Sequence, residues 1–347
     1  MNPLDHYTGN LTWLPARTIF LCRAGSHAYG TALPTSDQDF RGVAIPPREY
    51  FYGYLNRFEQ AEIRGEQDVV VYDVRKFVAL AADCNPNIIE LLFTDPSDWV
   101  MDDYEWRELH RARDLFLSQK AVHTFTGYAY SQLNRIRSHR EYLLNPKEVQ
   151  PRRGDFGLPE ELTLPKEQMN VIDSRIRKLA DTLAGGGLTK DQIEAQHERD
   201  LIASACRELD VGLNLMEVIR AERRYKAAMK AWSQYQTWKR ERNPARAELE
   251  AKFGYDCKHG MHLVRLLRMG AEILAGQGCI VKRPDAGELL AIRAGAWTLD
   301  RLLTYADEMQ QKIYDLQTTT ALPHVPDRAA IDRLLVGVVG SYLEEYQ

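Results

Sequence analysis

Two aspartates spaced by two residues follow a glycine-serine turn near the start of the chain, and these residue types together can bind a metal ion and a phosphate. Gly25 and Ser26 come directly after an apolar run, and Asp37 and Asp39 stand ahead of a second one. Strand side chains alternate between two faces, so the spacing predicts that both carboxylates point the same way. Paired carboxylates are hard oxygen ligands for Mg²⁺, with Mn²⁺ as an alternative. A Gly-Ser turn at a helix start offers backbone N–H groups and a hydroxyl to a phosphate. Together the two features predict a nucleoside triphosphate site.

If this predicted site transfers a nucleotide with the help of two bound metal ions, a third carboxylate is usually needed on a neighbouring strand. Asp68 opens the β-branched run 69–72, where a ligand borne on a strand should lie. Asp73 precedes the helical pattern 74–82 and has a natural role as its N-cap, worth about 1 kcal/mol. We therefore prefer Asp68 as metal ligand and as base for the attacking hydroxyl, with Asp73 as the alternative.

A second set of polar residues lies far along the chain on one stripe of a predicted helix. Lys258, His262 and Arg265 are spaced at i, i+4 and i+7. Cations on such a stripe would neutralise the β- and γ-phosphates if they faced the metal site, whereas the ordinary alternative is a solvated helix face. His259 and His262 are three apart and could chelate a metal, but no third ligand is near in sequence, which argues against zinc.

These segments resemble the DNA-polymerase-β-like nucleotidyltransferase superfamily, whose signature is Gly-Ser followed by Asp-x-Asp. They are closer to predicted nucleotidyltransferases associated with RNA repair. The resemblance covers roughly residues 19–100 and 250–345. The blocks that carry it are residues 25–30, 36–42, 85–91 and 254–267.

The resemblance implies a Mg²⁺-dependent transfer of a nucleoside monophosphate from a nucleoside triphosphate (NTP) to an acceptor hydroxyl, with release of pyrophosphate. Asp68 falls where the family carries its strand aspartate, and Arg41 would contact phosphate or pair with an aspartate. The implied acceptor is an RNA 3′ end, for example of tRNA. Two alternatives stay open: nucleotidylation of a protein or small molecule, and a nucleotide- or RNA-binding module without turnover.

The segment 220–246 is locally basic, with nine lysines and arginines against two glutamates, and four aromatic residues are interleaved. Cations with aromatics can hold an RNA backbone and stack unpaired bases. The competing interpretation is an amphipathic helix whose aromatics pack against a partner helix. The candidate RNA-binding residues are Arg223, Arg224, Lys230, Lys239, Arg240 and Arg242.

Bulk composition narrows the class of protein. The 347 residues carry a net charge of −4, so a nucleic-acid site must be a local patch. Residues 1–12 lack the basic and apolar regions of a secretion signal, and no apolar stretch is long enough to span a bilayer. The five cysteines are scattered, which favours reduced thiols. We therefore expect a cytoplasmic protein with no membrane partner, and the oligomeric state stays open.

The periodicity of apolar residues predicts the elements that must position these side chains. Strands are expected at 19–23, 39–45 and 68–72. Helices are expected at 74–82, 88–93, 105–144, 166–184, 188–242, 256–276, 285–294, 299–318 and 327–345. Asp285 and Glu288 have the spacing of a capping box. The predicted fold class is α+β: a small mixed-sheet nucleotidyltransferase domain over 1–110, then a larger all-helical domain over 111–347, with 145–250 as a helical insertion or arm.

Overall fold

The computed structural model describes residues 2–65, 67–184 and 190–345. Within these residues, five strands form one mixed sheet in the order β3-β4-β2-β1-β5. The strands are β1 (Thr18–Ala24), β2 (Asp39–Ala44), β3 (Gln60–Ile63), β4 (Asp68–Asp73) and β5 (Trp99–Asp102). Strands β2 and β4 run parallel, and the other neighbouring pairs are antiparallel.

The three predicted strands are present, while β3 and β5 were not predicted. Both are four residues long, and each forms an edge of the sheet. Such short runs carry little periodicity of their own, because the pairing partner supplies most of the stabilisation. The helices among and after the strands are α1 (Ser26–Tyr29), α2 (Glu49–Tyr52), α3 (Val74–Ala82), α4 (Pro86–Leu92) and α5 (Tyr104–Arg111).

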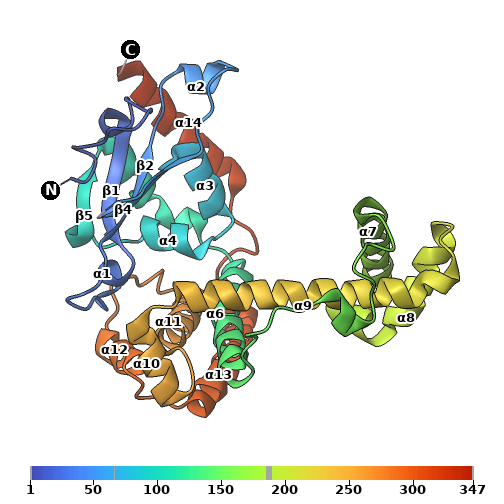
Figure 1. Ribbon diagram of the computed structural model, residues 1–347. Helices are drawn as coiled ribbons and strands as arrows, with labels where there is room; N and C mark the ends of the chain where they lie inside the picture. Colours follow the sequence, from blue (N-terminus) through green and yellow to red (C-terminus); the bar gives the residue numbers. More distant parts are fainter. Residues whose placement is uncertain (1, 66, 185–189, 346–347) are drawn as a thin grey trace. The chain divides into compact units, whose positions relative to one another are not determined.

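The chain divides into two compact units. The first unit contains the chain up to Arg140 and again from Pro244 onward. Beside the sheet it holds most of α6 (Ala121–Leu144), then α10 (Pro244–Phe253), α11 (Cys257–Leu274), α12 (Ala286–Arg293), α13 (Leu299–Thr319) and α14 (Arg328–Glu345). In this unit α3, α4 and α14 lie on one side of the sheet (Figure 1).

The second unit runs from Glu141 to Asn243 and contains α7 (Lys166–Leu183), α8 (Lys190–Glu208) and α9 (Met216–Glu241). It has a core of its own around Ile172, Ile176 and Ile202. The predicted α+β class, a small mixed sheet followed by a larger helical part, is confirmed. The assignment of catalysis to residues 1–110 stays a prediction. Across the described residues, every helix is too short or too polar to cross a lipid bilayer.

Two predicted helices are split, and one predicted cap is replaced. The span 105–144 contains a break between α5 and α6, and 188–242 breaks between α8 and α9. Asp285 stands at the start of α12 without capping it, because its carboxylate instead accepts hydrogen bonds from Arg268 and Arg283. Glu288 also binds Arg268. A charged partner from another element thus displaces the local capping box.

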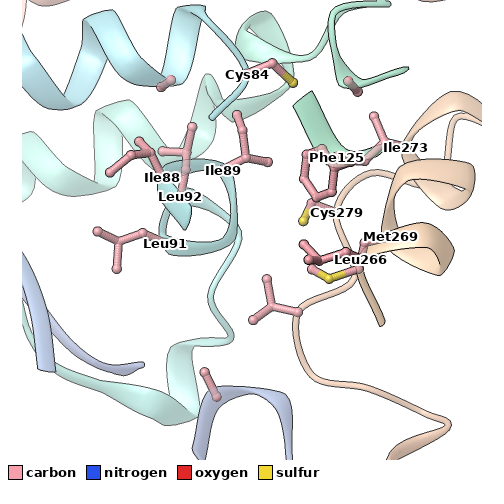
Figure 2. Packing of buried hydrophobic residues seen from close by; sticks show 14 of the residues in the cluster. Cys84, Ile88, Ile89, Leu91, Leu92, Phe125, Leu266, Met269, Ile273 and Cys279 are labelled. Carbon is pink, nitrogen blue, oxygen red and sulfur yellow. The ribbon is translucent and has the colours of Figure 1, made fainter. Parts of the chain in front are cut away.

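The two faces of the sheet are buried by different parts of the chain. Leu21, Phe40 and Val71 pack against the first residues of the chain, including Leu4 and Leu14. The opposite face joins a larger core that extends through α3 and α4 to the C-terminal helices. Figure 2 shows the isoleucines and leucines of α4 facing Leu266, Met269 and Ile273 of α11, with Phe125 of α6 beside them.

One buried polar cluster connects the short helix after β1, helix α4 and helix α11. The Arg265 guanidinium forms an ion pair with the Glu90 carboxylate, and the Tyr29 hydroxyl donates a hydrogen bond to the same carboxylate. Arg265 also lies over the Tyr29 ring, 3.8 Å from its centroid. Arg265 and Glu90 are 5% and 6% exposed. The apolar core therefore contains a charge pair that each of the three helices must contact.

Removing one member of this pair should destabilise the first unit strongly. We expect Arg265→Met to lower the free energy of unfolding by about 3–5 kcal/mol, because Glu90 is left as an uncompensated buried charge. Urea denaturation followed by circular dichroism measures this. Arg111→Met on α5 breaks an exposed ion pair with Glu108 and should cost about 1 kcal/mol or less. The double variant Glu90→Gln/Arg265→Met should lose less than the two single variants added together. A cost for Arg265→Met no larger than that for Arg111→Met would contradict this view of the core.

Candidate active site

The glycine-serine turn contacts one of the two predicted aspartates. Strand β1 ends at Ala24, which is paired in register with Asp39 at the start of β2. Gly25 then turns the chain into α1 with φ 62° and ψ −137°, a conformation open essentially to glycine alone. A Cβ atom at this position would lie 3.0 Å from Oδ2 of Asp39. Glycine therefore permits the backbone to approach the carboxylate, and Ser26 opens the helix that follows.

The parallel pairing of β2 and β4 places Asp68 beside Asp39. The two residues are register partners, each the first residue of its strand, so their side chains leave the same face of the sheet. Neighbouring strands are about 4.8 Å apart. Asp39 is half-buried and Asp68 is exposed. Two carboxylates at this separation, open to solvent, can share a divalent cation.

The alternative third carboxylate, Asp73, lies at the other end of β4, five residues or about 16 Å along the strand. Its side chain accepts hydrogen bonds from the backbone N–H groups of Arg75 and Lys76 at the start of α3. It also forms an ion pair with Arg75, at 2.7 Å between Nη2 and Oδ2. Asp73 thus caps the helix, as its position in the sequence suggested, and the geometry favours Asp68 as the partner of Asp39.

Asp37 differs from the sequence expectation in its local structure. Strand β2 begins at Asp39, so Asp37 lies in the preceding loop and is exposed. Pairing with β1 stops there because β1 itself ends where the chain turns at Gly25. Strand alternation therefore does not set the direction of the Asp37 side chain, and its metal-binding role stays a prediction.

A cavity of about 250 Å³ lies over this face of the sheet. Arg41, predicted as a nucleotide contact, lines it, and its Nη2 lies 3.9 Å from Oδ1 of Asp39. The sequence analysis missed Gln60 and Glu62, which line the cavity from edge strand β3. The alternation of these two residues with Ala61 and Ile63 could have predicted this strand.

A second cavity, of about 350 Å³, adjoins the first and shares Tyr29 and Asn87 with it. Its basic lining residues are Arg135, Lys258, His259, His262 and Arg265. Its described lining includes no aspartate or glutamate. The predicted stripe on α11 therefore faces a pocket in the same unit as Asp39. A strongly basic pocket beside an acidic one suits a ligand that carries phosphates and a metal ion.

The members of the stripe differ in what they can contact. Arg265 was predicted to bind nucleotide, but its guanidinium is buried against Glu90 and Tyr29, so it acts first as part of the core. Lys258 and His262 are half-buried in the first turns of α11. Arg135, on α6, is exposed at the cavity. The sequence analysis did not assign Arg135 to this site.

The basic segment of the second unit is largely neutralised by acidic side chains of the same unit. Arg223 binds Glu194 at 2.9 Å and lies 3.7 Å from Asp173. Lys239 binds Glu148 at 2.8 Å. Four further candidates complete the predicted set: Arg240 pairs with Glu241, Arg242 lies over the Trp238 ring, and Arg224 and Lys230 are exposed.

The aromatic residues of this segment pack within the unit. Tyr235 is 4% exposed, its hydroxyl donates to Glu148, and its ring contacts Tyr142 and Trp238. This arrangement fits the packing interpretation of α9. The RNA-binding role of its cations stays a prediction.

Part of the chain is similar to a known protein family. Residues 9–150 match the family model described as "RNA repair pathway DNA polymerase beta family". This match supports a polymerase β-like nucleotidyltransferase family for this part of the chain. The matched residues include the Gly25 turn, Asp39 and Asp68. The family indicates nucleotidyltransferase activity.

A curated relative is known only as an uncharacterized 38.9 kDa protein in the nrdC-mobD intergenic region of Enterobacteria phage T4. It is 27% identical to this chain over 130 residues. The match covers 34% of the chain and 38% of the phage protein. No solved structure matches the chain.

The environment of His262 predicts a pH effect on stability. Burial, followed by the nearby charges of Arg265 and Lys258, lowers the pKa of His262 well below its usual range. Below about pH 6.5 the unfolded chain therefore binds a proton that the folded chain does not, and stability falls on acidification. We expect His262→Gln to lose less stability than wild type between pH 7 and pH 5.5, by about 1 kcal/mol. Urea midpoints at both pH values measure this.

The control for this measurement is His123→Gln, which replaces an exposed histidine on α6. It should retain the pH dependence of the wild type. If the stability of His262→Gln and of the wild type fell equally between the two pH values, His262 would take up its proton equally in the folded and unfolded states.

Proposed function

We propose that this chain is a Mg²⁺-dependent nucleotidyltransferase that moves a nucleoside monophosphate from an NTP to an RNA 3′-hydroxyl, as in tRNA or a broken RNA, and releases pyrophosphate. The observation that carries the proposal is the register pairing of Asp39 with Asp68, beside a glycine turn that abuts the Asp39 carboxylate. This pairing brings two carboxylates and a tight backbone turn to the same end of strands β2 and β4.

The donor chemistry of this end of the strands fits Mg²⁺. Asp39 and Asp68 would hold the ion, with Asp37 as a further carboxylate, and all three offer the hard oxygen atoms that Mg²⁺ prefers. Bound divalent cations supply positive charge to the attacking and leaving oxygens of the reacting phosphate. Asp68 is exposed, so it is accessible to accept the proton of the attacking hydroxyl.

The remaining residues would bind and orient the triphosphate. Gly25 and Ser26 offer a backbone turn and a hydroxyl next to Asp39, where a phosphate would lie. Lys258 and Arg135 line the adjoining basic cavity and would neutralise the β- and γ-phosphates, while the neutral His262 ring would offer a hydrogen bond. Arg265, paired with Glu90, would act by holding Tyr29, which lies in the wall of both cavities.

The proposal of an RNA acceptor is supported by the description of the matching family, which names an RNA repair pathway. Neutralisation of Arg223 and Lys239 within the second unit favours a smaller role for α9 in RNA binding. A protein or small-molecule acceptor is therefore the alternative that the assay must separate.

Replacing the paired carboxylates should abolish transfer without unfolding the protein. We expect Asp39→Asn and Asp68→Asn each to slow transfer by about a hundredfold or more, because metal ligation contributes several kcal/mol to the transition state. Each α-labelled NTP, with Mg²⁺ or Mn²⁺, is incubated with total RNA or total protein. Asp332→Asn, an exposed aspartate on α14, is the matched control and should keep wild-type activity.

The labelled product decides the acceptor. Label in RNA that is lost in both variants supports the proposal, whereas label in protein assigns the alternative acceptor. No label with any nucleotide would instead indicate a binding module without turnover. Full activity in Asp39→Asn and Asp68→Asn would exclude the proposed site. Asp37→Asn, assayed in parallel, tests whether the loop aspartate belongs to it.

A methyl group at Gly25 should disturb the same site. Gly25→Ala adds a Cβ atom 3.0 Å from Asp39 Oδ2 at a residue with φ 62°. We expect at least a tenfold loss of transfer, because the turn must move away from the carboxylate. Gly30→Ala is the matched control, since Gly30 also has a positive φ, of 73°, but its added Cβ meets only Ala286, at 3.7 Å. Equal losses in the two variants would mean that backbone strain, rather than the contact with Asp39, controls activity.

A further inference from the structure

Two histidines and two carboxylates from distant parts of the sequence meet in the first unit, at the start of α11 and apart from the Asp39–Asp68 pair. They are His139 on α6, Glu250 on α10, Asp256 directly before α11, and His259 in the first turn of α11. His259 also lines the basic cavity. Glu250, Asp256 and His259 are 2%, 3% and 9% exposed, so three of the four groups are shielded from water.

The spacing of the donor atoms is that of ligands around a cation. His139 Nδ1 lies 3.4 Å from Glu250 Oε1 and 3.9 Å from Asp256 Oδ2, and His259 Nε2 lies 3.6 Å from Asp256 Oδ2. The ligand atoms of His139, Asp256 and His259 all lie within 4.8 Å of one another. A tetrahedral zinc site with bonds of about 2.0–2.2 Å has edges of roughly 3.3–3.6 Å between its ligands. The distances of 3.6 and 3.9 Å exceed ordinary hydrogen bonds and lie close to the edges of such a tetrahedron, which fits three ligand atoms grouped around a cation.

The orientation of His259 is set by a second contact. Its Nδ1 lies 2.8 Å from Oε1 of Gln132, an amide oxygen that can only accept, so Nδ1 carries the proton. In the neutral ring the Nε2 atom then carries a lone pair, 3.6 Å from Oδ2 of Asp256. A metal ion bound to both atoms would use this lone pair and the carboxylate oxygen together. Histidine ligands of metals are typically held in this way by a hydrogen bond from the other ring nitrogen.

The Asp256 carboxylate is also fixed in place. Its Oδ1 accepts hydrogen bonds from the backbone N–H groups of Lys258 and His259, at 2.9 and 3.1 Å. Its Oδ2 is left directed at both histidines. One oxygen caps the helix while the other is available to a cation. This double use explains how a buried N-cap aspartate can also be a ligand.

We propose that His139, Asp256 and His259 bind one divalent transition-metal ion of the zinc class. Imidazole nitrogen favours zinc over Mg²⁺, and the Asp256 carboxylate adds a negative charge. Three protein ligands leave a further coordination position, and Glu250 lies beside His139 at the edge of this group. The ion would tie α6, where the chain leaves the first unit, to α11, soon after the chain re-enters it. The sequence analysis had considered His259 only with His262.

The test is metal binding by the full chain after treatment with a chelator. Isothermal titration with Zn²⁺, metal analysis after gel filtration, and the visible absorption of bound Co²⁺ should report one ion per chain in tetrahedral geometry. We expect excess Mg²⁺ to leave this ion bound. His139→Gln and His259→Gln should each weaken zinc binding by at least about a hundredfold and abolish the rise in melting temperature that zinc produces. Gln132→Met removes the contact that orients His259 and should weaken binding by about ten- to a hundredfold.

His123→Gln, an exposed histidine on the same helix as His139, is the matched control and should bind zinc like the wild type. Asp256→Asn preserves a good N-cap residue while removing the charged ligand, so it reports on binding if a histidine variant fails to fold. Absence of stoichiometric zinc in the wild type, or binding undiminished in His139→Gln, His259→Gln and Asp256→Asn, would overturn the proposal. Zinc binding is measured directly on the protein, so this result does not depend on transfer activity.

Discussion

The buried ion pair between Glu90 and Arg265 is the interaction on which the first unit depends. A charge inside a protein core costs several kcal/mol unless a partner of opposite charge meets it. Glu90 on α4 and Arg265 on α11 are both nearly inaccessible to water. If either helix moved away, the other would therefore be left with an unpaired buried charge. Tyr29 joins the pair through its hydroxyl and its ring.

This constraint also sets the relation between the two cavities. Tyr29 stands four residues after Gly25, in the turn that abuts Asp39, and Arg265 stands seven residues after Lys258 on α11. Holding Tyr29 against Arg265 therefore holds the acidic end of strands β2 and β4 next to the basic pocket. A triphosphate with its metal ions needs both kinds of surface within a few ångströms. The core of the fold and the proposed chemistry thus depend on the same three side chains.

Local patterns predicted the features that are decided locally. The strand before Gly25, the strand after Asp39 and the cap at Asp73 follow from residue types within a few positions. What the sequence could not supply is the pairing of distant segments. Glu62 lines the cavity because β3 pairs with β4. Glu90 can be buried in the core because Arg265 forms an ion pair with it. His139 and His259 are separated by well over a hundred residues, so spacing in the sequence contained no sign of their contact.

The basic segment on α9 shows why the net charge of a sequence segment differs from the charge that the folded segment offers to a ligand. In the sequence Arg223 and Lys239 have no acidic partner nearby, because their partners lie on α7, on α8 and in the loop after α6. Once folded, the helix packs its aromatic residues and offsets much of its charge within its own unit. The opposite happens at Arg135 and Lys258, which come from two distant helices and line one pocket. The proposed phosphate contacts therefore depend on clustering in space rather than in sequence.

The two proposed cation sites differ in the hardness of their donor atoms. We therefore expect them to bind different metal ions. Asp39 and Asp68 offer only oxygen and open to solvent, which suits an exchangeable Mg²⁺ that arrives with a nucleotide. His139 and His259 add nitrogen, and Asp256 is buried, which suits an ion that stays with the protein. His139 lies on α6, near the point where the chain leaves the first unit, and Asp256 and His259 lie at the start of α11, soon after the chain re-enters it. An ion bound by these three residues would therefore join two segments of the first unit that the insertion separates in sequence, and it would hold the start of α11, which carries Lys258, in place.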